Sequence, residues 1–166
     1  MDVDERLARI EAILEIERLQ YAYGEACDDG YPPDRLGEMF TADARWVREF
    51  AGEGAGKECI GRAAIEEHFA ATPMRFLWGS HNCMPVQIDV SPGAQSAVGR
   101  WRLQMPCVLL FDGEPRDFWI SGRYRNDYVV EDGRWRFKTV RMIYDVATPV
   151  DAAWPARAID RTYLDG

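Results

Sequence analysis

The candidate catalytic histidine of this sequence is His81, in the stretch FLWGSHNCMPVQIDV at residues 76–90. An apolar run breaks just before it at Gly79 and Ser80, and a strand-like run begins just after it. An imidazole changes charge near neutral pH, so a histidine in a pocket can serve as a general base. A lone histidine is more often a packing or surface residue, and the second one, His68, lies among glutamates in IEEHFAA and is predicted at the surface.

The segment YAYGEACDDG supplies a hydroxyl and a carboxylate at the end of a predicted helix. Tyr23 continues the apolar stripe of that helix, so we expect a buried ring whose hydroxyl needs a partner. Asp28 follows Tyr21 by seven residues and is nearly in line with it on a helix, so which of the two tyrosines faces a pocket stays open. Asp29 is expected to cap the following turn.

An arginine on the last predicted strand is the fourth candidate. Residues 135, 137, 139, 141 and 143 alternate onto one face, and the aromatic rings of Trp135 and Phe137 indicate that this face looks inward. Arg141 would then be a cation inside a pocket, where it could hold an anionic substrate group. The alternative is an arginine near a strand end that reaches a carboxylate or extends to water.

These residue types favour acid–base chemistry on an organic substrate rather than hydrolysis through a covalent serine. The motifs GxSxG, GxGxxG, GxxxxGK[ST] and HExxH are absent from the sequence. The carboxylates near Asp28 lack the neighbouring ligands that a metal site requires. The sequence therefore predicts a site without a metal and without a cofactor.

The elements that must position these groups are three helices followed by long strands. Apolar residues at spacings of three and four, from Leu7 to Cys27, predict a helix over residues 4–28. The other predicted elements are helices at 33–40 and 61–73, a short strand at 44–49, and hairpin-connected strands at 97–111, 117–131 and 134–146. Helices followed by such strands indicate an α+β fold with the helices on one face of an antiparallel sheet.

The strand that follows His81 has its aliphatic residues at even positions, including Met84 and Ile88. An unbroken strand would then turn His81 toward the opposite side, together with Cys83. We expect either a bulge near Pro85 or a sheet whose pocket face is the odd-numbered one.

Composition restricts the class of protein. The chain has 166 residues, 47% hydrophobic and 29% charged, which suits one globular domain, assigned to residues 1–148 with a covering C-terminal tail at 149–166. The net charge is −8 and the basic residues are dispersed, which argues against nucleic-acid or membrane partners. No segment has the length of a membrane span, and the acidic N-terminus does not resemble a secretion signal, so a cytoplasmic location is expected. The cysteines are predicted to be reduced packing residues: Cys27, Cys59, Cys83 and Cys107.

At this level of detail the chain resembles a known family. The segments IERLQYAYGEACDDG, LGEMFTADARWV, GRAAIEEHF, WGSHNCMPVQIDV and GRYRNDYVVEDGRWRFKTVRM are similar, over about residues 5–146, to the SnoaL-like family of the nuclear transport factor 2-like superfamily. The resemblance implies a cone-shaped barrel, in which a curved antiparallel sheet packs around N-terminal helices and receives a small apolar organic substrate. It also implies a homo-oligomer, a dimer or trimer, which the exposed arginines of the sheet could join: Arg100, Arg102, Arg123 and Arg125.

Within that superfamily the pattern is most similar to three lyases: bile-acid 7-alpha-dehydratase, scytalone dehydratase and hexachlorocyclohexane dehydrochlorinase. By this resemblance His81 is a general base, Asp28 orients its ring, Tyr23 donates a hydrogen bond, and Arg141 holds developing negative charge. A further carboxylate expected on the next strand has no match, because Arg102 and Gln104 occupy that region. The residues assigned to the substrate-binding wall are Trp78, Trp101, Met105, Trp119, Tyr124 and Phe137.

The resulting hypothesis is a cofactor-independent dehydratase that eliminates water from a hydroxylated polycyclic or steroid-like substrate. Two alternatives stay open. One is a ketosteroid-type isomerase or a polyketide cyclase that uses the same base. The other is a non-catalytic small-ligand binding module, for which Asp28 and His81 would lie too far apart to share a hydrogen bond.

Overall fold

The computed structural model describes residues 2–52 and 54–150. The helices are α1 (Val3–Asp28), α2 (Pro33–Gly37) and α3 (Arg62–Ala71), with a short 3-10 helix η1 (Thr72–Met74) after α3. The strands are β1 (Phe40–Phe50), β2 (Gly54–Ile60), β3 (Phe76–Gly79), β4 (Asn82–Val90), β5 (Ser96–Phe111), β6 (Glu114–Glu131) and β7 (Arg134–Pro149).

The predicted helices and long strands are confirmed, with a shorter α2 and a longer β1. Strand β2 was not predicted, because its glycine-rich start is typical of a turn. The predicted tail lies outside the described residues from position 151 onward.

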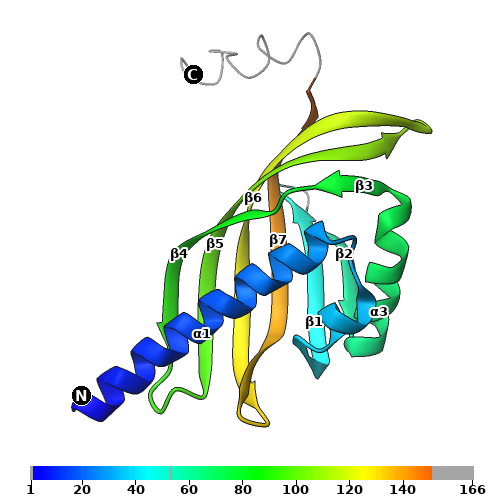
Figure 1. The fold of residues 1–166 in the computed structure, drawn as a ribbon. Coiled ribbons are helices and arrows are strands. Elements are labelled where there is room, and N and C mark those ends of the chain that lie inside the picture. The colour runs from blue at the N-terminus through cyan, green and yellow to red at the C-terminus, as the bar shows by residue number, and fades with distance from the viewer. Residues whose placement is uncertain (1, 53, 151–166) are drawn as a thin grey trace, which may run out of the picture.

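The strands form one curved seven-stranded sheet in the order β2-β1-β7-β6-β5-β3, and β4 also pairs with β5. All pairs are antiparallel except β1 with β7, which is parallel. Helix α1 crosses one face of this sheet, and α3 lies near its β1–β2 end (Figure 1). The predicted α+β class with a curved, cone-like sheet against the N-terminal helix is confirmed. The sheet is not closed, and it is mixed because β1 and β7 are parallel.

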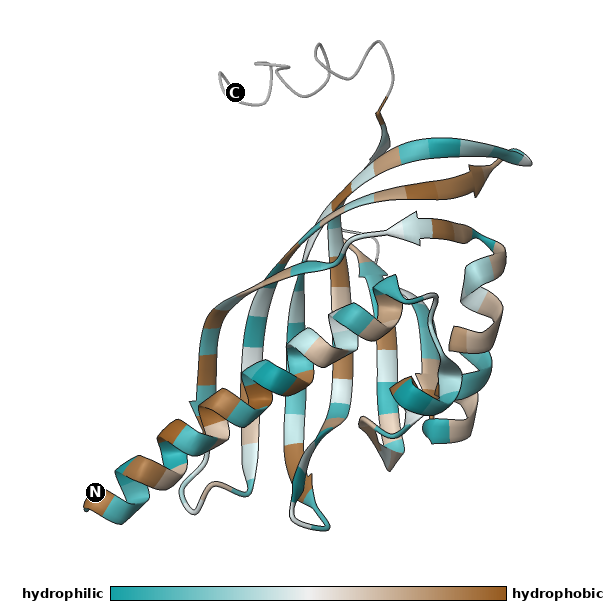
Figure 2. Ribbon diagram, in the orientation of Figure 1, coloured by the Kyte–Doolittle hydropathy of each residue, from teal (hydrophilic) through white to brown (hydrophobic). Residues whose placement is uncertain are grey.

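Helix α1 begins at a capping box and buries mainly its C-terminal half. The Asp2 carboxylate accepts a hydrogen bond from the Glu5 backbone N–H at 2.8 Å, and the Glu5 side chain accepts one from the Asp2 backbone at 3.0 Å. From Ile16 onward the helix packs on the sheet, whereas Leu7 and Ile10 are 52% and 53% exposed. Figures 1 and 2 show this N-terminal part, rich in hydrophobic residues, extending past the sheet. The predicted apolar stripe is therefore buried only in its second half. No helix of the described part of the chain is long and apolar enough to cross a membrane.

A buried polar network connects α1 to the sheet. The Gln20 side-chain oxygen accepts hydrogen bonds from the Asn126 amide at 2.8 Å and from the Tyr128 hydroxyl at 3.0 Å. The Tyr128 hydroxyl also accepts one from the Trp101 indole N–H at 2.9 Å. Gln20 and Asn126 are fully buried, so these bonds replace the water that both amides lose on folding. The network fixes the height and rotation of α1 over the sheet.

Bulges in β4 and β7 help decide which side chains face α1. In β4, Pro85 pairs with Trp101 and Gln87 with Arg100, so Val86 is an extra residue. The bulge expected near Pro85 is thus confirmed, and Cys83 before it and Ile88 after it both pack on the core. In β7, Phe137 and Thr139 pair with adjacent residues of β6, so Lys138 is extra and the inward face changes parity after it.

Candidate active site

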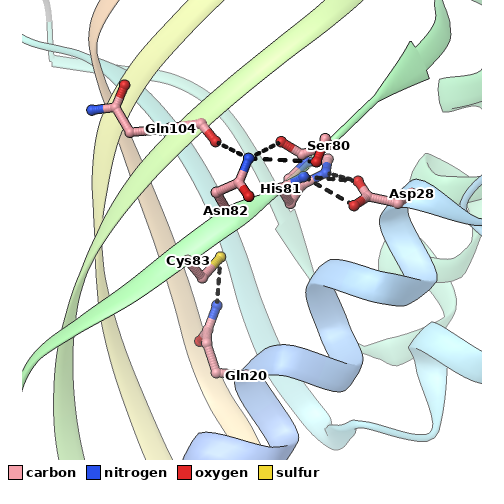
Figure 3. A network of polar contacts seen from close by, with 7 residues as sticks. All are labelled: Gln20, Asp28, Ser80, His81, Asn82, Cys83 and Gln104. Atoms are coloured by element: carbon pink, nitrogen blue, oxygen red, sulfur yellow. Dashed lines mark hydrogen bonds and ion pairs between the residues drawn. The ribbon is translucent and has the colours of Figure 1, made fainter.

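His81 and Asp28 form a hydrogen-bonded pair where the end of α1 meets the start of β4 (Figure 3). The His81 Nδ1 atom lies 2.6 Å from Asp28 Oδ1. The backbone N–H of His81 also donates to both carboxylate oxygens, at 2.9 and 3.0 Å. The His81 side chain is 6% exposed and that of Asp28 is 32% exposed. Asp28 therefore fixes both the backbone position and the ring orientation of His81.

This contact selects one tautomer of the neutral His81 ring. An ionised carboxylate can only accept hydrogen bonds, so the proton of the ring lies on Nδ1. The Nε2 atom then keeps its lone pair and can accept a proton. An imidazolium formed by that step is stabilised by the Asp28 charge.

Helix α1 passes close to the His81 backbone at Gly24. A Cβ atom at Gly24 would lie 3.4 Å from the His81 carbonyl oxygen and 3.6 Å from its Cβ atom. One turn earlier, the Gln20 amide donates to Cys83 Sγ at 3.8 Å (Figure 3). Gly24 and Gln20 thus place the helix so that its last turn brings Asp28 to His81.

A cavity of about 430 Å³ extends from His81 between α3 and the concave face of the sheet. A pocket of this size suits a small organic ligand. Its wall is mostly apolar and aromatic, and it includes Tyr23 but not Tyr21. Tyr21 is 43% exposed and contacts Trp101 at the ring edge. Of the two tyrosines that the sequence left open, Tyr23 is the one at the cavity.

The Tyr23 hydroxyl is held by two neighbours. The Trp46 indole N–H donates to the hydroxyl oxygen at 3.0 Å, and the hydroxyl also lies within hydrogen-bonding reach of the Cys27 thiol. Burial, together with the nearby Cys27, raises the pKa of Tyr23 well above its ordinary value. The side chain therefore stays protonated in the neutral range.

His68 is part of the same cavity, and its predicted surface position is wrong. It is half-buried, and its ring lies 4.3 Å from that of Trp46, centroid to centroid. Burial, with the nearby cations Lys57 and Arg48, lowers its pKa from 6.5 to about 4. His68 is therefore neutral at pH 7. Spacing alone did not reveal this, because the glutamates beside it lie on other faces of α3.

Arg141 lies outside the cavity, so its predicted place on the inward face is wrong. The bulge at Lys138 reverses the alternation of β7, and Val140, Met142 and Tyr144 are buried instead. The Arg141 Nη1 atom lies 2.5 Å from Glu49 Oε1, whose side chain is 17% exposed. The alternative interpretation, an arginine that reaches a carboxylate, is what the structure has.

Of the six residues predicted to line the substrate wall, only Tyr124 lines the cavity. Trp101, Met105 and Phe137 are buried; Phe137 packs against the Tyr128 ring, and Trp101 donates to the Tyr128 hydroxyl. Trp78 is 56% exposed. Trp119 alternates with the buried Phe118 and Ile120, so it lies on the other face of β6. The wall residues that the sequence did not predict include Tyr31, Trp46, Arg48, Lys57, Phe69, Arg75 and Tyr144.

No group of three or more His, Cys, Asp or Glu side chains among residues 2–52 and 54–150 is arranged to hold a metal ion. The four cysteines are free thiols, three of them buried. Burial raises the pKa of the Cys83 thiol to about 11, so it is protonated at neutral pH. Among the groups at the cavity that can exchange or donate protons are the two histidines and the tyrosine hydroxyls.

Comparison with known proteins agrees with the fold. Residues 8–141 match the family model described as the SnoaL-like domain. Sequence comparison with curated proteins finds no match.

Several solved structures share the fold at low sequence identity. A candidate scytalone dehydratase from Novosphingobium aromaticivorans superposes with a TM-score of 0.73 and 22% identity, over 87% of this chain and 91% of that one. A type 2 hexachlorocyclohexane dehydrochlorinase superposes with a TM-score of 0.76 and 19% identity, over 89% and 94%. A candidate aromatic ring hydroxylase from N. aromaticivorans gives 0.67 and 22%, over 85% and 94%. At these identities the likeness shows a shared fold and leaves the reaction to be argued from the site.

Proposed function

This chain belongs to the SnoaL-like domain family, and from that premise we propose that it is a cofactor-independent lyase that eliminates water from a hydroxylated hydrophobic substrate. The observation that carries the proposal is the 2.6 Å contact between His81 and Asp28 at the wall of an apolar cavity. It leaves the Nε2 atom of a neutral imidazole free to take a proton. Two of the structures with the same fold are named for elimination reactions, the candidate scytalone dehydratase and the dehydrochlorinase, which supports the choice of reaction class.

The reaction begins at a carbon atom made acidic by a neighbouring carbonyl group. His81 Nε2 takes the proton, and the electrons of the C–H bond move toward the carbonyl, whose oxygen becomes an enolate. The Tyr23 hydroxyl donates a hydrogen bond to that oxygen as its negative charge develops. Asp28 stabilises the imidazolium.

The second step restores the carbonyl and expels the leaving group. The enolate electrons form the new carbon–carbon double bond, and the carbon–oxygen bond to the hydroxyl group breaks. The leaving oxygen takes a proton from the imidazolium and departs as water, so His81 returns to its starting state.

The same geometry bears on the two alternatives. A binding module needs no ordered contact between Asp28 and His81, and the pair is hydrogen-bonded through both the ring and the backbone. An isomerase would use the same base and the same tyrosine, and returns the proton to another carbon atom. The product distinguishes the two reactions, because dehydration lowers its mass by one water and isomerisation leaves it unchanged.

The test is a turnover screen with β-hydroxy ketones on steroid and polyketide-like ring systems. Product mass and the absorbance of the new conjugated double bond are measured for the wild-type chain and for His81→Ala. We expect loss of one water, dependent on His81. A product of unchanged mass would replace the dehydratase by an isomerase, and equal rates in the two proteins would remove His81 from the mechanism.

A further inference from the structure

Two cations lie side by side at the β1–β2 end of the cavity. Arg48 of β1 is directly paired with Lys57 of β2, and both line the cavity. Alternation along β1 places Arg48 on the same face as Trp46 and Phe50, which also line it. A third cation, Arg75, lies at the wall just after η1.

These cations have no acidic partner at the cavity within the described ranges 2–52 and 54–150. None of the lining residues is Asp or Glu. The acids nearest in sequence point elsewhere, since Glu49 pairs with Arg141 and Glu58 with Arg45. The Arg48 Nε atom is buried and makes no hydrogen bond with the described residues.

Such an arrangement favours an anionic ligand. Like charges directly opposite on neighbouring strands repel each other, and a buried donor without an acceptor loses its hydration without compensation. The positive field also acts on His68, because Lys57 and Arg48 both contribute to the low pKa of its imidazole, after burial. Groups of this kind are found where a ligand supplies the missing charge.

We propose that Arg48 and Lys57 bind an anionic oxygen group of the substrate, a carboxylate, sulfate or phosphate. This inference rests on the proposal that the cavity is the active site. It assigns to these two residues the anion-binding role that the sequence suggested for Arg141.

The order of the sheet places this anion and the reacting carbon at different parts of the cavity wall. Strands β2 and β1 lie at one edge, whereas His81 precedes β4, which pairs with β5 near the other edge. The substrate therefore spans the cavity, with its charged group at the β1–β2 end and its acidic C–H bond at His81. Binding energy from such a remote group can position the reacting atoms.

Binding of matched naphthalene probes tests this inference without any turnover. Isothermal titration calorimetry compares 2-naphthoate with its neutral near-isostere 2-naphthamide, and adds 2-naphthyl sulfate and 2-naphthyl phosphate. Because a charge-assisted hydrogen bond is stronger than one between neutral groups, we expect an anion to bind the wild-type chain at least about tenfold more tightly than the amide. The anion with the highest affinity indicates whether the substrate group is a carboxylate, a sulfate or a phosphate.

Single substitutions show which residues cause the preference for an anion over the amide. Arg48→Gln and Lys57→Gln should each reduce the ratio of anion to amide affinity, and Arg102→Gln, an exposed arginine of β5 outside the cavity, should leave it unchanged. Circular dichroism checks that each variant is folded. Because Lys57 is exposed, we expect Lys57→Gln to fold normally, so it still tests the anion site if Arg48→Gln does not fold.

Two results overturn the anion site: a wild-type ratio near one, or a ratio that survives both cavity variants. His81→Ala should keep the wild-type ratio. If the ratio is present but the turnover screen finds no dehydration, the anion site stands and the lyase proposal fails. If dehydration is found but the wild-type ratio of anion to amide affinity is near one, the lyase proposal stands and the anion site fails.

Discussion

Asp28 Oδ1 lies 2.6 Å from His81 Nδ1, although the two residues are 53 positions apart in the chain. The contact joins the last turn of α1 to the residue just before β4. The neighbouring Asp29 does not take part, since its carboxylate lies 2.5 Å from Arg35 Nη1. One of two adjacent carboxylates therefore orients the histidine, and the other is engaged in an ion pair at the surface.

Removal of the base or its partner should affect turnover far more than folding. We expect His81→Ala to lower kcat by about two to four orders of magnitude, the usual contribution of a general base. Asp28→Asn keeps the size and one acceptor oxygen but removes the charge, so we expect a decrease of about 10- to 100-fold. Asp29→Asn is the matched control and should retain the wild-type kcat. Comparable decreases in both asparagine variants would contradict the assigned role of Asp28.

Tyr23→Phe should lower both activity and stability, for separate reasons. The enolate loses its donor, so we expect kcat to fall by about 10- to 100-fold. The buried Trp46 indole N–H also loses its acceptor, which costs roughly 1–3 kcal/mol of unfolding free energy. In the double variant Tyr23→Phe with Trp46→Phe, the unpaired donor is gone as well.

Urea unfolding and kinetics of the single and double variants separate the two roles of Tyr23. The double variant should recover part of the lost stability without recovering kcat. A recovery of both quantities together would mean that Tyr23 acts only through packing.

The dyad was predicted through the family resemblance, which assigned its roles to His81 and Asp28. The residues alone indicated only where the two lie: Asp28 ends a long helix whose stop signals are explicit in DDG and the prolines after it, and His81 lies just before a long strand. The bulge at Val86 was also predictable, because Pro85 cannot donate a ladder hydrogen bond. Local chemistry of this kind is visible in single residues.

The cavity wall was not predictable in the same way, because strand parity fails at a bulge that has no signal in the sequence. Lys138 is an ordinary strand residue, yet its insertion reverses the alternation of β7 and moves Arg141 to the outer face. The cations of the cavity come from β1 and from β2, whose glycine-rich start is typical of a turn. His68 and Trp46 meet only through the packing of α3 on β1.

The free energy of unfolding should decrease as the pH falls below about 6.5, because of the titration of His68. The folded state lowers the pKa of this imidazole from 6.5 to about 4, so the unfolded chain binds its proton more readily. The contribution of His68 to unfolding free energy is therefore complete above about pH 6.5 and is lost progressively as the pH falls toward 4. His68→Phe keeps an aromatic ring against Trp46 and cannot titrate.

Thermal midpoints of wild type and His68→Phe, measured from pH 7.5 to 4, test this assignment. We expect the wild-type midpoint to decrease more steeply between pH 6.5 and 4, and the other titrating groups are common to both proteins. Parallel curves would show that His68 does not carry the difference.

Asn126 should be more important for stability than its neutral side chain suggests. Its amide donates to Gln20, and its oxygen accepts the backbone N–H of Arg141 at 3.2 Å. Asn126→Ala leaves the Arg141 N–H without this acceptor and leaves the Gln20 oxygen with the Tyr128 hydroxyl as its remaining donor, so we expect a loss of roughly 1–3 kcal/mol. Gln20→Ala should also lower stability, because Asn126 and Tyr128 then lose the same acceptor.

Urea unfolding of the single and double variants gives the coupling energy, which we expect to reach about 1 kcal/mol for groups in one network. Strictly additive losses would mean that Gln20 and Asn126 stabilise α1 and the sheet independently, and α1 would then not owe its position over His81 to this network.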